Sequence, residues 1–279
     1  MKKLFLSALT VLLIFVCFTS CVKNPGETLQ NNYFENSNIR SIEIASGWKV
    51  VVEQSNTSNY VVLEYSDAIS DKIIVKLENG NLKLELKYCS FSCIDMEMNA
   101  TIYVTTLESI ELSGASEVVI SGTFQVDDLN IEMSGASELS GGVFTASSID
   151  VDLSGASYLK NMYLSGNDCE ITASGDSYIE AVFDVSDEMD VNLSGASDLY
   201  NDATSDLQHA DLSLEGASKV EMINQAVETL DVSFSGASEA RVNVINVITG
   251  RLSGSSDLYY YGNPTTDVNC SGGSAIHKL

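Results

Sequence analysis

The chain has 279 residues, of which 39 are Asp or Glu and 14 are Lys or Arg, so its formal net charge is −25 at pH 7. This acidity argues against binding to nucleic acid, because contact with a phosphate backbone requires clustered positive charge, and it disfavours anionic polysaccharides for the same reason. The whole chain holds 2 histidines, so a serine or cysteine nucleophile would have few candidates for its general base.

Residues 1–20 predict an export signal peptide. Lys2 and Lys3 precede an apolar run over residues 4–18 that is too short to cross a membrane comfortably. The run leads into Thr19-Ser20-Cys21, which resembles a lipoprotein signal, in which the cysteine becomes the lipidated N-terminus. Ordinary cleavage, with Cys21 left as a thiol, is the alternative. We expect an outer-membrane lipoprotein, held to the membrane by lipid at Cys21, on the periplasmic or the surface face.

Residues 21–36 form a polar tether, and residues 37–106 alternate between apolar and polar positions, which predicts β-strands. Asn79-Gly80 between two such runs predicts a hairpin turn, whereas residues 66–72 interrupt the alternation as a short helix or loop. A disulfide between Cys89 and Cys93 would require a turn, and both the bonded and the free state stay open. We expect this segment to cap one end of the repeats that follow.

From residue 107 to residue 279, a phrase built on Ser-Gly-Ala-Ser recurs nine times, in steps of 18 to 21 residues. A fixed period of this length is typical of a solenoid, whose repeats bury their apolar faces by stacking on their neighbours. The leucine-rich repeat pattern is absent, and a propeller blade would need about 40 residues. We expect the glycines to form constrained corners, since glycine tolerates backbone torsions that other residues avoid. They are Gly114, Gly135, Gly155, Gly175, Gly195, Gly216, Gly236, Gly254 and Gly272.

Each phrase lies between two short alternating segments, which predicts a strand, a corner and a second strand. Positions −6, −4, −2 and +4 from the glycine are mostly apolar. A coil of 20 residues rising about 3.3 Å each has a perimeter of roughly 66 Å. We therefore predict an all-β fold, a right-handed parallel β-helix over residues 107–279 with a β-rich N-terminal cap. Cys169 and Cys270 take apolar positions, and we expect both in the core.

Position +2 is serine in all nine repeats. Stacked hydroxyls can hydrogen-bond to the backbone of the corner or to one another, whereas a nucleophile would need an adjacent base. We therefore interpret this column as structural. Position +1 is small almost throughout, so the corners should form a flat strip.

Positions +3 and +5 should point outward, because alternate residues of a strand face opposite sides of the sheet. This predicts a candidate ligand face that contains Tyr158, Tyr178, Tyr200, Lys160 and Glu180, with Lys160 and Glu180 able to pair across one coil. We expect no cofactor, and the cysteines lack the neighbouring ligands of a zinc site. A divalent cation between outward carboxylates, such as those of residues 150, 152 and 170, stays open.

The order of these motifs is similar to that of a known family. Ile-Glu-Ile at residues 42–44, Gly-Trp-Lys-Val-Val-Val-Glu-Gln at 47–54, Asn-Gly-Asn-Leu-Lys-Leu at 79–84 and the tandem Leu-Ser-Gly-Ala-Ser phrases resemble the head GIN domain family of auto-transporter adhesins, common in Bacteroidetes. The resemblance covers residues 38–279 and implies an extracytoplasmic β-helical fold. It supplies no binding residues.

Two classes of function follow. We favour a non-enzymatic binding or adhesion module that contacts a glycan or an envelope or host protein, because aromatic rings flanked by polar groups suit such ligands; exposed tyrosines are, however, also ordinary strand formers. The alternative is a structural envelope protein that packs through its flat Ala/Ser strip. A polysaccharide-cleaving β-helix enzyme is disfavoured, since it would need a positive groove and the repeats contain only five Lys or Arg residues.

Overall fold

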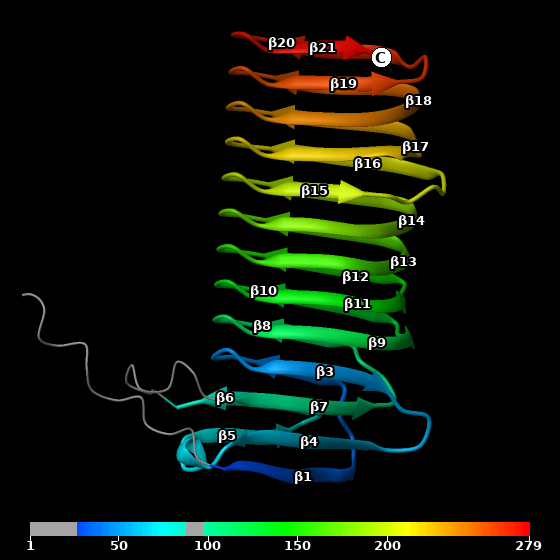
Figure 1. Ribbon diagram of the computed structural model, residues 1–279. Helices are drawn as coiled ribbons and strands as arrows, with labels where there is room; N and C mark the ends of the chain where they lie inside the picture. Colours follow the sequence, from blue (N-terminus) through cyan, green and yellow to red (C-terminus); the bar gives the residue numbers. More distant parts are fainter. Residues whose placement is uncertain (1–26, 88–96) are drawn as a thin grey trace, which may run out of the picture.

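The computed structural model describes residues 27–87 and 97–279, which form one sheet of 21 strands wound into a parallel β-solenoid of about 8 turns (Figure 1). The predicted all-β parallel β-helix is confirmed. Within these ranges the helical structure is a single 3₁₀ turn, η1 (Asp67–Ile69), at the interruption that the sequence predicts. In the same residues there is no helix long and apolar enough to cross a membrane.

Seven strands precede the repeats, and fourteen make up the coils that carry the Ser-Gly-Ala-Ser corners. The first set is β1 (Thr28–Ser37), β2 (Ser41–Ile44), β3 (Lys49–Gln54), β4 (Asn59–Ser66), β5 (Ile73–Glu78), β6 (Asn81–Leu86) and β7 (Met98–Val104). The second set is β8 (Ser109–Leu112), β9 (Glu117–Gln125), β10 (Asp128–Met133), β11 (Glu138–Thr145), β12 (Ser148–Leu153), β13 (Tyr158–Ala173), β14 (Tyr178–Leu193), β15 (Asp198–Asn201), β16 (Leu207–Leu214), β17 (Lys219–Phe234), β18 (Glu239–Leu252), β19 (Asp257–Tyr261), β20 (Thr265–Cys270) and β21 (Ala275–Lys278).

Each regular coil runs from its corner to a second bend on the opposite edge of the rod and then returns (Figure 1). Strands before the corner pair in parallel with their equivalents one coil away, as β10 does with β12, and strands after the corner do the same, as β11 does with β13. The pairing keeps equivalent positions in register, so Leu139 lies beside Leu159. Each position of the repeat therefore becomes a column along the rod.

The nine repeat glycines all have φ between 72° and 84°, a region that side chains rarely adopt. A Cβ atom on Gly195 would lie 2.4 Å from the carbonyl oxygen of Gly175 in the coil below. The corners approach this closely because the amide of Ala196 donates a 2.8 Å hydrogen bond to that same oxygen. The corner thus combines a left-handed torsion with a backbone contact that leaves no room for a side chain.

The serines at position +2 are buried at the corner in the first eight repeats. In seven of these eight, the hydroxyl donates to the carbonyl oxygen three residues earlier, as from Ser157 to Ser154 at 2.8 Å and from Ser197 to Ser194 at 2.9 Å. Among the serines of this column in the described residues, contact between hydroxyls of adjacent coils occurs once, at 3.3 Å between Ser137 and Ser157. The column mainly satisfies turn carbonyls, and this is how a hydroxyl is accommodated beside an apolar core.

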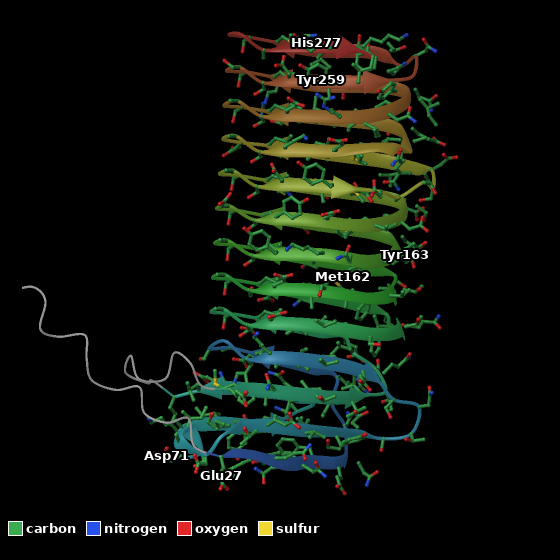
Figure 2. The ribbon with its side chains drawn as sticks, viewed as in Figure 1. Glu27, Asp71, Met162, Tyr163, Tyr259 and His277 are labelled. Atoms are coloured by element: carbon green, nitrogen blue, oxygen red, sulfur yellow. The ribbon has the colours of Figure 1, made fainter. Side chains whose placement is uncertain are left out.

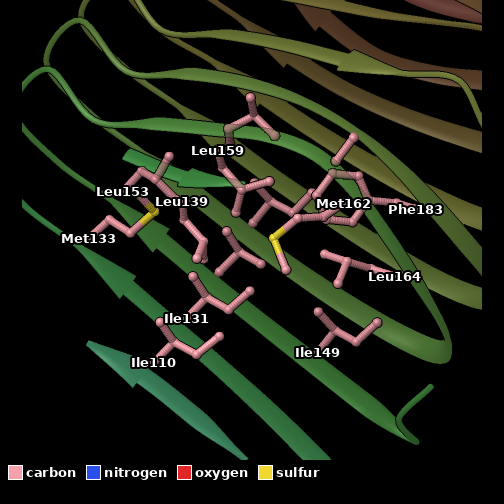
Figure 3. Close-up of a cluster of buried hydrophobic side chains, with 14 of the residues drawn as sticks. Ile110, Ile131, Met133, Leu139, Ile149, Leu153, Leu159, Met162, Leu164 and Phe183 are labelled. Atoms are coloured by element: carbon pink, nitrogen blue, oxygen red, sulfur yellow. The ribbon is translucent and has the colours of Figure 1, made fainter. Parts of the chain in front are cut away.

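The core fills the interior of the coils with the side chains of positions −6, −4, −2 and +4 and with apolar residues further along the same coils, such as Met162, Leu164 and Phe183 (Figure 3). Ile131, Leu139 and Phe183 are fully enclosed. Cys169 is 3% exposed, and burial raises the pKa of its thiol, as expected for a small core residue. The expectation for Cys270 is wrong, because that residue is exposed. Its strand, β20, pairs with β18 alone, so no further coil covers its inward side.

Two adjacent coils share a buried amide pair that the repeat pattern does not indicate. Asn201 and Gln225 are 2% and 0% exposed, and Nδ2 of Asn201 donates to Oε1 of Gln225 at 2.9 Å. Oδ1 of Asn201 accepts from the amides of Phe183 and Ala203, at 2.9 and 3.0 Å. Asn201 is the last residue of β15, where the chain leaves regular strand structure before β16 begins. The two amides form hydrogen bonds with backbone groups at this place.

The N-terminal segment continues the solenoid out of chain order. β2 and β3 pair in parallel with β8 and β9, so Ile42 lies beside Ile110 and Val50 beside Val118. β6 and β7 then pair in parallel with the other edges of β2 and β3. The segment therefore adds strands to the coils themselves, beyond the capping role that the sequence suggests.

The turn between β2 and β3 has the same function as the repeat corner but a different sequence. Ser46 and Gly47 have φ of 73° and 82°. Lys49 pairs with Glu117 in register, so Trp48, one residue earlier, takes the position that serine holds in the repeats. Trp48 is 0% exposed. A large indole thus replaces the small hydroxyl at this level of the core.

Antiparallel strands cover this end of the stack. β4 pairs antiparallel with β7, β5 with β6, and β1 with β4 (Figure 1). The predicted Asn79-Gly80 hairpin is confirmed: it joins β5 to β6, with φ of 53° and 87° at its two residues. These values are typical of a type I′ turn, which matches the twist of the flanking strands. The antiparallel cover satisfies backbone groups that a bare parallel edge would expose.

Candidate binding face

The candidate ligand residues lie on the outer side of the strands that follow the corners. Tyr158 pairs with Tyr178 in register, and Lys160 with Glu180, while Glu180 pairs with Tyr200 one coil further on. Tyr158 is 37% exposed, and its neighbours in sequence, Ser157 and Leu159, are buried. The structure therefore brings all five residues together on one surface, which we call the tyrosine face.

The three tyrosines form a continuous stack along the rod. Ring centroids are 6.2 Å apart between Tyr158 and Tyr178 and 5.5 Å apart between Tyr178 and Tyr200, with the planes tilted by 39° in both pairs. Nζ of Lys160 lies 4.6 Å from the centroid of Tyr158, and Nζ of Lys219 lies 4.9 Å from that of Tyr200. Both distances are typical of cation–π contacts, so an ammonium group flanks each end of the stack.

The polar groups of the tyrosine face are largely paired with one another. Lys160 contacts Glu138, with 3.5 Å between Nζ and Oε1, and the expected pair with Glu180 is absent from the ion pairs of the described residues. Glu180 instead accepts a 3.0 Å hydrogen bond from the hydroxyl of Tyr178. Burial, and secondly this hydrogen bond, raise the pKa of Tyr178 to about 12. Lys160 thus lies between Glu138 in the preceding coil and Glu180 in the next, and it pairs with Glu138.

The same face extends further than the sequence analysis proposed. Arg241 lies over the ring of Tyr259, 4.9 Å from its centroid, and Tyr259 stacks on His277 at 4.7 Å (Figure 2). Arg241 also pairs with Glu239 at 2.9 Å. These residues occupy positions +3 and +5 of later repeats, so extending the two columns to the last coils would have found them.

The strands before the corners carry a different outer surface, rich in carboxylates. Asp150, Glu170 and Asp190 are neighbours in register on successive strands. Burial, followed by repulsion from adjacent carboxylates, raises the pKa values of Glu111, Asp152 and Asp211. Within residues 27–87 and 97–279, no group of three or more His, Cys, Asp or Glu side chains could hold a metal ion. The cation bridge suggested for residues 150, 152 and 170 gains no support from this arrangement.

Several residues singled out by the sequence lie outside the described part of the chain. They are the signal peptide over residues 1–20, the lipidation candidate Cys21, and the pair Cys89 and Cys93. Their roles stay predictions.

Comparisons with known proteins agree with this architecture. The family model described as "Putative auto-transporter adhesin, head GIN domain" matches residues 38–181 and 160–264. A "putative adhesin" of known structure from Parabacteroides merdae ATCC 43184 is 12% identical, with a TM-score of 0.67 over 91% of this chain and 97% of its own. A second "putative adhesin", from Parabacteroides distasonis ATCC 8503, is 13% identical, with a TM-score of 0.66 over 91% and 98%.

A "putative lipid binding protein", also from Parabacteroides distasonis ATCC 8503, is 15% identical, with a TM-score of 0.64 over 91% of this chain and 97% of its own. No curated protein matches the sequence. At these identities the likeness to solved structures concerns the fold.

Proposed function

Because the chain belongs to the head GIN domain family of auto-transporter adhesins, we propose that it is a non-enzymatic binding module of the cell envelope, which presents the tyrosine face to its ligand. Family membership supports an adhesin-type role in general, and the face supplies the residues for it. We assign the contact to Tyr158, Tyr178 and Tyr200, with Lys160 and Glu180 beside them.

The observation that carries this proposal is the tyrosine stack on a rigid parallel sheet. The rings are held in place by one another and by the flanking lysines, so a ligand would order few side chains on binding. Tyrosine edges and hydroxyls offer both apolar contact and hydrogen bonds. The net charge of −25 repels sulfated or uronic acid ligands, which favours a neutral glycan or a protein surface.

A non-enzymatic role is supported by the state of the hydroxyl column. The serine hydroxyls at position +2 donate to turn carbonyls, as from Ser197 to Ser194. Nδ1 of His209 lies 2.9 Å from Oγ1 of Thr229, and its Nε2 lies 3.8 Å from Oδ2 of Asp231. Nε2 of His277 lies 3.0 Å from Oδ1 of Asp257. Neither histidine is hydrogen-bonded to a serine of the column in the described residues, which a nucleophile and its base would require.

The test is a glycan and host-protein array probed with the full chain, compared with the double variant Tyr158→Ala, Tyr178→Ala. We expect the variant to lose binding while its melting temperature stays close to that of the parent. The matched control is Tyr60→Ala, Tyr103→Ala, which removes another stacked pair, with centroids 4.2 Å apart, from the N-terminal part. Full binding by the first variant, or equal loss by the control, would contradict the proposal.

We further propose attachment to the outer membrane through lipid on Cys21. The predicted tether after Cys21 is polar, so two or more acyl chains would provide the stable anchor. Cys21→Ser should release the protein from washed membranes and abolish labelling with a fatty acid analogue, whereas Cys270→Ser should change neither. A cleaved Cys21→Ser protein that stays in the membrane fraction would exclude this anchor. Protease treatment of intact cells then distinguishes the surface from the periplasmic face.

A further inference from the structure

A second surface of the rod has features of a ligand site that the tyrosine face lacks. An open groove of about 510 Å³ lies along the second bends of three successive coils, next to the junction with the N-terminal strands. This volume is within the range of roughly 300–1,000 Å³ that is common for small-molecule sites. We call it the bend groove; Gln125–Asp127, Thr145–Ser147, Asn167, Thr106 and Glu108 line it.

The bend groove exists because the strands stop on either side of the bend in these coils. β9 ends at Gln125 and β10 begins at Asp128, and the same gap separates β11 from β12. In the next two coils, β13 and β14 continue through the equivalent bend without interruption. The floor is apolar and small, with Ala146 buried and Val126 half-buried against the core.

Four polar side chains of the walls are not used by the protein itself, whereas Thr145 contacts Ser165 and Glu108 pairs with Arg40. Within the described ranges, the side chains of Gln125, Asp127, Ser147 and Asn167 have no hydrogen-bond or ion-pair partner. One coil further on, the equivalent side chains are already paired, since Asp187 accepts hydrogen bonds from Ser186 and Gln208 at 3.1 and 3.0 Å. At this level of the rod, the unpaired groups of the bend groove thus differ from the equivalent groups one coil further on.

This is the reverse of the tyrosine face, where Lys160, Glu180 and Lys219 are all paired with neighbours. A ligand on that face must compete with existing contacts, whereas one in the bend groove exchanges only water. Hydrogen bonds contribute most to binding when the groups they use have no alternative protein partner.

The lining also indicates the class of ligand. No Lys or Arg lines the bend groove, the carboxylate of Glu108 is paired with Arg40, and the unpaired carboxylate of Asp127 would repel an anion. Backbone groups are engaged between coils, as in the 3.0 Å bond from the amide of Val126 to the carbonyl of Thr145, so an extended peptide would find no free strand edge here. Hydroxyl, amide and carboxylate side chains remain, and these pair well with sugar hydroxyls, which both donate and accept.

We propose that the bend groove binds a neutral saccharide, aligned with the rod and contacted by Gln125, Asp127, Ser147 and Asn167. The site is separate from the tyrosine face and does not depend on it.

The test is a neutral-glycan array with the full chain, followed by calorimetric titration of the saccharide that binds best. The double variant Gln125→Ala, Asn167→Ala should weaken binding by roughly tenfold or more, since it removes two hydrogen-bonding amides. The control Asn192→Ala, Asn269→Ala removes two exposed amides from the strands before the corners and should leave the affinity unchanged. Equal melting temperatures for all three proteins would show that folding is intact.

The other outcomes separate this proposal from the previous one. If the Tyr158→Ala, Tyr178→Ala variant loses the saccharide while the groove variant keeps it, the bend groove is the wrong site and the tyrosine face stands. If no neutral glycan binds, or a basic peptide binds in place of one, the saccharide site is refuted. Comparing the free saccharide with the same unit immobilised on the array distinguishes a soluble sugar from a surface glycan as its source.

Discussion

The two parts of the rod reach the same stacking by different routes. In the repeats, each coil follows its neighbour in sequence and uses the same corner, with a glycine above a glycine. In the N-terminal part, β2 and β3 lie between β8 and β9 on one side and β6 and β7 on the other. The difference shows that inward apolar alternation and a left-handed turn suffice for a coil, and that the Ser-Gly-Ala-Ser phrase is one solution among several.

The largest loss of stability should follow when the N-terminal corner is given the serine of the repeats. Trp48→Ser would leave a large cavity in a fully buried site and should lower the free energy of unfolding by about 3–5 kcal/mol. Trp48→Phe is the control. Nε1 of Trp48 is the one buried side-chain nitrogen or oxygen without a hydrogen-bond partner in the described residues, so Trp48→Phe breaks no hydrogen bond, and its smaller cavity should cost about 1–2 kcal/mol. Urea unfolding followed by circular dichroism measures both; similar losses for the two variants would be evidence against this packing role.

Replacing a corner glycine by alanine should cost more stability in the repeats than in the N-terminal part, although both costs are smaller than that of Trp48→Ser. Gly195→Ala places Cβ 2.4 Å from the oxygen of Gly175 at φ +77°, and should cost about 3 kcal/mol. Gly47→Ala, at φ +82°, meets no atom nearer than 3.9 Å and should cost about 1 kcal/mol for the torsion alone. Gly195→Val, which is β-branched, should be at least as harmful as Gly195→Ala. Equal melting temperatures for the two alanine variants would contradict the proposed contact between coils.

The serine column should contribute less per residue. Ser197→Ala removes the 2.9 Å hydrogen bond to the carbonyl of Ser194 and should cost about 1 kcal/mol. Ser194→Ala, at the half-buried position three residues earlier in the same corner, is the matched control and should change little, because it keeps the carbonyl that accepts this bond. A neutral Ser197→Ala variant would mean that the buried hydroxyl is tolerated without supporting the turn.

The smallest effect concerns the carboxylates before the corners. Burial and neighbouring acids raise the pKa values of Glu111, Asp152 and Asp211 in the folded chain, so their ionised forms are disfavoured there. That penalty is present above the raised pKa values and disappears as the pH falls through them. The melting temperature should therefore rise as the pH is lowered from 7 toward these raised pKa values. The triple variant Glu111→Gln, Asp152→Asn, Asp211→Asn should flatten that rise, and an unchanged slope would contradict the assignment.

The repeats were largely predictable because each coil repeats the same local pattern. Alternation around each glycine predicted which side chains face the core, and it placed Tyr158, Tyr178 and Tyr200 on one outer surface. What failed concerned neighbours along the rod: Cys270 has an inward position but no covering coil, and Lys160 pairs with Glu138 in the coil below. The position of a residue in the repeat predicts whether its side chain points inward or outward. Which residue it contacts depends also on its rotamer and on the side chains of the neighbouring coils.

The N-terminal arrangement could not be predicted from a local pattern. Pairing of Ile42 with Ile110 joins strands that are far apart in sequence, and alternation within each strand is compatible with many partners. The bend groove was also missed, because it depends on where strands stop at Gln125 and Thr145. Strand ends are set by packing at the bend, which a repeat of similar residues does not specify.

The position of Trp48 makes the junction between the two parts observable by fluorescence. It is the only tryptophan in the chain, and its fully buried indole lies in the coil next to the first repeat. Its emission therefore reports on water reaching that level of the rod, whereas far-ultraviolet circular dichroism averages over every coil. An emission shift that precedes the loss of sheet signal would place the first opening where the N-terminal strands meet the repeats, and coincident transitions would make the whole rod one cooperative unit.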